Sequence, residues 1–271
     1  MPQLRAPDGA PLAYDAFEPS RPIAAVLWVG GWSDHRTRWF AAGERLKQAG
    51  YATYVLDQRG QGESGGARAH LSRFSQLLGD LQAFRRMVRL RTTAPQVLLG
   101  HSFGGLVVLR YLETQPSDAV AAAVLSSPWL ATTAPVSAVQ RIGARLLADL
   151  WPTIKFDTRL DPAQLSRDPS IGASYLTNPA IHRRITPGAW REIQWAQRVV
   201  PEDAHRIECP LQFLLGGADR ITDALAARRF ADGLRIPVEV HWYPELRHEL
   251  LNDPERERVI GDVLAFLARM R

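Results

Sequence analysis

Cysteine and lysine are scarce in this chain of 271 residues. Cys209 is the sole cysteine, so no internal disulfide can form, and nothing points to a cysteine metal cluster. Because only Lys47 and Lys155 are lysines, the formal net charge of +5 comes almost wholly from arginine. The arginines are interleaved with acidic residues throughout the chain, whereas nucleic-acid-binding proteins usually cluster such charge. We therefore expect no nucleic-acid partner.

Long apolar runs are also missing. No stretch approaches the roughly twenty apolar residues that cross a bilayer. Residues 1–9 contain no apolar segment of the kind found in signal peptides. These absences predict a soluble, cytoplasmic protein. With 46% hydrophobic residues, the chain can still bury the core of one large α/β domain.

Short apolar runs alternate with segments of helical spacing over most of the chain. The strand-like runs are 23–29, 51–56, 96–101, 120–125, 211–215 and 236–243, and the first of them is continuously apolar, as in a strand buried on both faces. Strands separated by helices need crossover connections, so we predict an α/β fold with a mostly parallel sheet. Residues 11–19 alternate apolar and polar side chains, which predicts an antiparallel edge strand.

The alternation of strands and helices stops between residues 130 and 206, where helical patterns, prolines and arginines replace clear strands. We predict a core of residues 1–129 and 207–271, with residues 130–206 inserted as a helical cap. Residues 141–151 have the apolar spacing of an amphipathic helix. That helix is either packed on the core or exposed as a lid toward substrate or a lipid interface.

A serine stands at a junction between a strand-like run and a helix-like segment, in Gly100-His101-Ser102-Phe103-Gly104. Gly-x-Ser-x-Gly at such a junction is typical of a nucleophile elbow, in which the serine hydroxyl stands above the sheet edge. The two glycines leave room for the neighbouring strand and helix. Because the pentapeptide alone is common by chance, the prediction depends on partners elsewhere in the chain.

A serine hydroxyl becomes a nucleophile when a histidine accepts its proton and a carboxylate orients that histidine. Asp219 and His248 each follow a strand-like run, so a parallel sheet would bring both to the edge that holds Ser102. We predict these three as catalytic residues, although Asp219 and His248 could also be ordinary loop residues. Asp223 is the nearest rival to Asp219. His101 lies inside the elbow, where we expect its side chain to point away from the serine.

Several short motifs follow one another in a set order. Asp-Gln-Arg-Gly-Gln-Gly-Glu-Ser spans 57–64, and Leu-Ser-Ser-Pro spans 125–128. Ser-Arg-Asp-Pro at 166–169, Asn-Pro at 178–179 and His-Glu-Leu-Leu-Asn-Asp at 248–253 come later. Together they resemble the monoacylglycerol lipase and lysophospholipase branch of the α/β-hydrolases, which are hydrolases of the serine aminopeptidase S33 type. The likeness covers nearly the whole chain and implies an α/β-hydrolase fold with an inserted cap.

The resemblance implies a serine hydrolase that cleaves carboxylic esters of single-chain acyl substrates through an acyl-enzyme, with no metal or organic cofactor. It assigns the oxyanion hole to the backbone N–H groups of Trp32 and Phe103. The family usually has His-Gly-x-Gly where this chain has Gly30 and the residues after it. The missing histidine removes a hydrogen-bonding anchor from the loop. The side chain of Trp32 either narrows the acyl site or merely packs.

The inserted segment also suggests a substrate pocket. We expect its apolar lining to include residues of the cap helix and the turn after it: Leu146, Leu147, Trp151 and Ile154. The expected partners are a small acyl ester and, transiently, a lipid interface at the cap. Nothing in the sequence indicates an oligomeric state.

Two other functions stay open. The first is an aminopeptidase of the proline iminopeptidase type, which would need carboxylates near Ser102 to hold the substrate ammonium. The second is a non-catalytic binding protein with a hydrolase-like fold.

Overall fold

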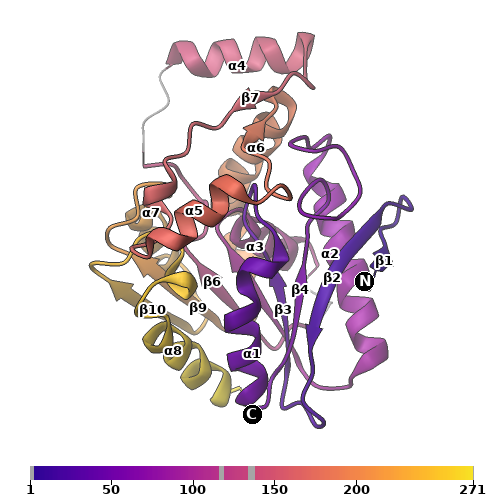
Figure 1. Cartoon of the computed structure of the whole chain (residues 1–271), viewed down its shortest axis with the longest axis vertical. Helices are drawn as coiled ribbons and strands as arrows, with labels where there is room; N and C mark the ends of the chain where they lie inside the picture. Colours follow the sequence, from indigo (N-terminus) through magenta and orange to yellow (C-terminus); the bar gives the residue numbers. More distant parts are fainter. Residues whose placement is uncertain (1–2, 116–118, 134–137, 271) are drawn as a thin grey trace.

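The computed structural model describes residues 3–115, 119–133 and 138–270 (Figure 1). Its central sheet has eight strands in the order β1-β2-β4-β3-β5-β6-β9-β10. The strands are β1 (Gln3–Arg5), β2 (Pro11–Phe17), β3 (Ala25–Val29), β4 (Ala52–Leu56), β5 (Gln96–His101), β6 (Ala122–Ser126), β9 (Leu211–Gly216) and β10 (Val238–Tyr243). Pairing is parallel from β4 through β10 and antiparallel at β1 and β2, which confirms the predicted mostly parallel sheet.

Helices cover both faces of this sheet. The helices outside the segment between β6 and β9 are η1 (Arg36–Trp39), α1 (Phe40–Gln48), α2 (Phe74–Arg91), α3 (Phe103–Thr114), α7 (Ala224–Asp232), η4 (Leu250–Asn252) and α8 (Arg256–Ala268). The apolar side chains of α2, α3 and α7 join one core cluster, and those of α1 and α8 join another. Successive residues of β3 enter opposite clusters, since Leu27 belongs to the first and Trp28 to the second. The continuous apolar run therefore marks a strand buried on both faces, as predicted.

The predicted strand at residues 11–19 is present and antiparallel, but its predicted place at the edge of the sheet is wrong. β2 lies between two partners, with Leu12 opposite Leu4 of β1 and Tyr14 opposite Leu56 of β4. The edge strand on this side of the sheet is β1, which is only three residues long. Three residues are too few for an alternating pattern to be recognised in the sequence.

Between β6 and β9 the chain forms mostly helices. These elements are α4 (Ala138–Leu150), β7 (Phe156–Asp157), η2 (Pro162–Gln164), α5 (Pro169–Thr177), β8 (Arg184–Ile185), α6 (Pro187–Asp203) and η3 (Ala204–Arg206). In Figure 1, α4 lies at the top, farthest from the sheet. β7 and β8 pair as a small antiparallel sheet that the sequence analysis missed, because each has only two residues. The domain boundaries at 130 and 206 stay a prediction.

Within the described ranges, no helix has both the length and the apolar character needed to span a membrane. The cytoplasmic location stays a prediction.

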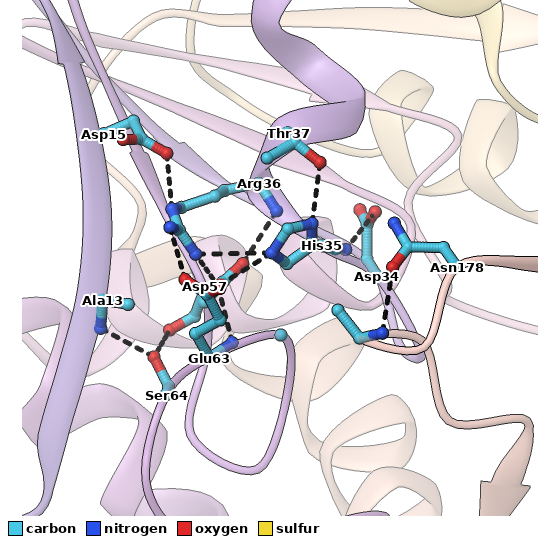
Figure 2. Close-up of polar contacts among 12 residues, drawn as sticks. Ala13, Asp15, Asp34, His35, Arg36, Thr37, Asp57, Glu63, Ser64 and Asn178 are labelled. Carbon is cyan, nitrogen blue, oxygen red and sulfur yellow. Dashed lines mark hydrogen bonds and ion pairs between the residues drawn. The ribbon is translucent and has the colours of Figure 1, made fainter. Parts of the chain in front are cut away.

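A buried guanidinium joins the loop after β3 to the loop after β4 (Figure 2). The Arg36 side chain is only 3% exposed, and it donates to Asp57 at 2.5 Å and to Glu63 at 2.6 Å. It also pairs with Asp15 on β2. The carboxylate of Asp57 accepts the backbone N–H groups of Arg36 and Glu63 as well. This network holds the loop that precedes α1 against the sheet.

Replacing Arg36 with glutamine should lower the free energy of unfolding by about 3–5 kcal/mol, because Asp57 would stay buried without its counter-charge. Urea denaturation followed by circular dichroism measures the loss. Arg45→Gln is the matched control, since Arg45 pairs with Glu257 at the surface, where an ion pair contributes about 0–1 kcal/mol. Equal losses in the two variants would contradict the role assigned to Arg36.

Candidate active site

Ser102 occupies a strained turn between β5 and α3. Its backbone has φ 53° and ψ −118°, a conformation that residues other than glycine rarely adopt. A Cβ on Gly100 would lie 2.6 Å from the Gly104 carbonyl oxygen, and one on Gly104 would lie 2.0 Å from that of Val29. Any side chain at either position would therefore collide with backbone. The expectation that this turn needs both glycines is confirmed.

Asp219 and His248 meet in the loops after β9 and β10, where Asp219 Oδ2 lies 2.8 Å from His248 Nδ1. Thr222 donates its hydroxyl to the same oxygen at 2.7 Å, and the backbone N–H groups of Ile221 and Thr222 donate to Oδ1. Asp223 instead accepts the backbone N–H of Ala226 and is the N-cap of α7. The carboxylate that contacts the histidine is thus the predicted one.

The electrostatics of this pair favour a basic imidazole. Burial alone would lower the pKa of His248, but the charge of Asp219 and its hydrogen bond outweigh burial and raise it. Burial alone would raise the pKa of Asp219, but His248 and the donors around the carboxylate hold it below its usual range. An ionised carboxylate beside a histidine of raised basicity is the arrangement that a general base needs.

The expectation for His101 is wrong. Its ring lies 4.8 Å from the ring of His248 and 4.9 Å from that of Trp39, and it lines the same cavity as Ser102. His101 shares a face of β5 with Leu99, whose side chain packs in the core cluster of α1 and α8. Burial, with His248 and Arg38 nearby, lowers the pKa of His101 well below its ordinary value, so the ring is neutral at physiological pH.

The loop after β3 has an anchor that the sequence analysis did not foresee. Asp34 Oδ2 accepts the backbone N–H of Gly31 at 2.9 Å and the indole N–H of Trp39 at 2.8 Å. A Cβ on Gly30 would lie 2.8 Å from the same oxygen. The loop lacks the histidine anchor, as expected, and the Asp34 carboxylate holds it instead.

Arg38 neutralises the carboxylates beside the cavity. It is buried, donates to both carboxylate oxygens of Glu249 at 2.6 and 2.8 Å, and lies 3.5 Å from Asp34. The only signal for Arg38 in the sequence is its spacing of four residues from Asp34, which places the two on one side of a helical turn. The partner Glu249 comes from a loop more than two hundred residues away.

The two backbone N–H groups assigned to the oxyanion hole face no protein acceptor in the described part of the chain. Phe103 is the first residue of α3, so its N–H group has no carbonyl within the helix to bond. Trp32 lies on the loop held by Asp34 and lines the cavity beside Ser102. Their roles toward a substrate stay a prediction.

A cavity of about 450 Å³ contains Ser102 and His248 in its wall. Its apolar lining comes from both the sheet loops and the segment between β6 and β9: Trp32, Trp129, Leu160, Ile185, Trp190 and Ile221. Its charged lining consists of Asp34, Arg38, Arg159, Asp161, Arg220 and Glu249. A pocket of this size accommodates a small organic molecule.

Four predicted substrate-binding residues lie elsewhere. Leu146, Leu147, Trp151 and Ile154 are absent from the described cavity wall, and all but Leu147 are exposed by 48% or more. They belong to α4 and the turn after it, and α4 packs against α6. Their role toward a substrate stays a prediction, because helical spacing shows an apolar face without showing which surface that face meets.

Comparisons with known proteins identify the family. The model of the serine aminopeptidase S33 family matches residues 20–255. The chain belongs to this family. The chain is 32% identical over 266 residues to a monoacylglycerol lipase of Mycolicibacterium smegmatis, and this match covers 96% of this chain and 93% of that one. It is 26% identical to phospholipase YtpA of Bacillus subtilis, and this match covers 92% of this chain and 97% of YtpA.

A solved structure agrees with this placement. The monoacylglycerol lipase of Paleococcus ferrophilus superposes on this protein with a TM-score of 0.85 at 28% identity. The match covers 96% of this chain and 99% of that one. The predicted α/β-hydrolase of the monoacylglycerol lipase-like branch is confirmed. So is the predicted enzyme class, a serine ester hydrolase.

Replacing Asp219 with asparagine should lower the pKa of His248. The wild-type pKa should exceed the ordinary value of about 6.5, because Asp219 raises it. Without the carboxylate charge, burial dominates and disfavours the imidazolium. NMR titration of the ring measures both values. Asp223→Asn is the control and should leave the pKa in place, so a larger shift in that variant would refute the pairing.

Proposed function

We propose that this enzyme cleaves the carboxylic esters of single-chain acyl substrates, such as monoacylglycerols or lysophospholipids. The carrying observation is His248, which contacts Asp219 and shares a largely apolar cavity with Ser102. The names of the relatives agree with this substrate class, since they include monoacylglycerol lipases and a phospholipase.

In the proposed mechanism, Ser102 Oγ attacks the acyl carbon while His248 accepts the serine proton. Because Nδ1 of His248 lies 2.8 Å from Asp219, Nε2 is the nitrogen available to the serine. The N–H groups of Phe103 and Trp32 stabilise the oxyanion, and the protonated His248 then protonates the leaving alcohol. Water then attacks the acyl-enzyme through the same steps, with His248 again accepting and returning the proton, and the acid is released.

The charges around the cavity favour an ester over an aminoacyl substrate. A free ammonium near Ser102 would need an uncompensated carboxylate. Asp34 and Glu249 are already paired with Arg38. Asp161 caps the turn η2 by accepting the Ala163 N–H group. Arg159 and Arg220 add positive charge to the wall, which would repel an ammonium.

We also propose that residues 130–206 act as a cap over the cavity. Leu160, Ile185 and Trp190 of this segment line the cavity opposite the sheet loops. The exposed side chains of Leu146 and Trp151 on its outer part would suit a transient contact with a lipid interface.

Replacing Ser102 with alanine should abolish esterase activity, with a loss on the order of 10⁶ in kcat. Hydrolysis of p-nitrophenyl butyrate measures the rate, and mass spectrometry after treatment with a fluorophosphonate should find the label on Ser102. Ser72→Ala is the control, because Ser72 is exposed and bonds His70 outside the cavity. A folded Ser102→Ala protein that keeps more than a per cent of the activity would exclude this nucleophile.

The enzyme should prefer longer acyl chains and reject aminoacyl anilides. Each methylene buried in the apolar cavity contributes about 0.8 kcal/mol, so kcat/KM should rise up to about fourfold per methylene over the short-to-medium range. A series of p-nitrophenyl esters from acetate to octanoate tests the trend. Turnover of proline p-nitroanilide that equals or exceeds that of the octanoate would favour the aminopeptidase instead.

A further inference from the structure

The backbone of Trp32 is held on both sides by polar contacts with the core. The N–H group of Gly31 donates to Asp34, and that of Ser33 donates to Gln61 Oε1 at 3.0 Å. Gln58 donates to the carbonyl oxygen of Gly30 at 2.8 Å. Ser33 has a φ of 58°, which a residue other than glycine adopts only when its surroundings hold it there. The orientation of the Trp32 N–H group thus depends on a short, constrained loop.

The side chain of Trp32 leaves this loop and reaches a distant part of the chain. Its indole N–H donates to the carbonyl oxygen of Arg184 at 3.0 Å. Its ring meets the ring of His182 nearly edge-on, with centroids 5.7 Å apart at 78°. The neighbouring Ser33 adds a parallel link, because its Oγ lies 3.3 Å from His182 Nδ1. Residues 182–184 are therefore joined to the loop at two consecutive positions.

The segment that Trp32 contacts continues into the cavity wall. Arg184 pairs with Asp157 across the small sheet of β7 and β8, and the N–H of Thr158 donates to the Arg183 carbonyl oxygen at 3.1 Å. Thr158 and Ile185 both line the cavity. A movement of this wall would consequently pull on the indole of Trp32.

The indole also packs on Phe103, with ring centroids 5.3 Å apart at 84°. Phe103 and Trp32 carry the N–H groups that the proposed function assigns to the oxyanion. We infer that Trp32 is a positioning residue whose indole ties both oxyanion donors to the cavity wall at residues 182–185. This inference rests on the proposed function, and it makes the geometry of the oxyanion hole depend on the position of that wall.

The competing explanation is that Trp32 merely fills space in the cavity. Trp129 provides a matched comparison, since it lines the same cavity and packs on Phe103 with centroids 6.4 Å apart. Its indole N–H is buried and has no hydrogen-bond partner among the described residues. Replacing Trp129 with phenylalanine therefore changes the cavity volume without removing a hydrogen bond, whereas the same change at Trp32 does both.

The test compares Trp32→Phe and Trp129→Phe with the wild type on p-nitrophenyl butyrate and octanoate. For Trp32→Phe we expect kcat to fall about fivefold to tenfold on both esters, with KM changing less than kcat. Affinity for an alkyl trifluoromethyl ketone should fall by a similar factor, because the oxygen of its serine adduct occupies the oxyanion site. For Trp129→Phe the larger change should be in KM, and it should depend on acyl length.

Equal effects of the two substitutions, or an effect of Trp32→Phe confined to KM, would overturn the inference and leave Trp32 a cavity-filling residue. A wild-type protein that hydrolyses neither ester would instead refute the proposed function.

A measurement on the wild type covers the case in which Trp32→Phe does not fold. Formation of the adduct with trifluoroacetone, whose methyl group represents the shortest acyl chain, should slow hydrogen exchange in residues 182–186. Unchanged exchange in that segment would also overturn the inference.

Discussion

The candidate active site depends on one close backbone contact, between the first turn of α3 and the end of β3. At Gly104 a side chain would lie 2.0 Å from the Val29 carbonyl oxygen and 2.5 Å from that of Gly30, so only glycine permits this approach. The contact places the N–H group of Phe103 beside the loop that carries Trp32. Beside it Ser102 has a positive φ, at the single residue where the chain turns from strand to helix. The serine and both proposed oxyanion donors therefore depend on the same packing.

The arginine-rich composition has a structural explanation. Buried carboxylates near the site are each matched by a guanidinium: Asp57 by Arg36, Asp80 by Arg59, and Glu249 by Arg38. Arginine suits this use better than lysine, because its planar group donates several hydrogen bonds in fixed directions and always keeps its charge. Among the described residues of these loops, Asp219 is the buried aspartate that pairs with no arginine. It faces His248 instead. That difference leaves its charge available to make the histidine basic.

The segment between β6 and β9 has an inner side and an outer helix that differ in what they contact. Its inner side lines the cavity and bonds the loop after β3 through Trp32 and Ser33. Its outer helix, α4, exposes large apolar side chains, including Leu150 at 65% exposure. An amphipathic pattern in the sequence thus described the helix correctly, but Leu146 and Leu150 of its apolar face are exposed and are not in the described wall of the cavity.

Much of this protein follows from local sequence patterns. The parallel sheet, the elbow at Ser102 and the positions of Asp219 and His248 at strand ends follow from apolar periodicity and glycine placement, because parallel strands must end at one edge. The anchor at Asp34, the direction of His101, the cavity wall and the bond from Trp32 to Arg184 do not. Each of these depends on which side chain fills the space beside another, and the last joins residues 152 positions apart. Such contacts exist only after the sheet, its loops and the inserted segment have packed together, so tertiary structure alone decided them.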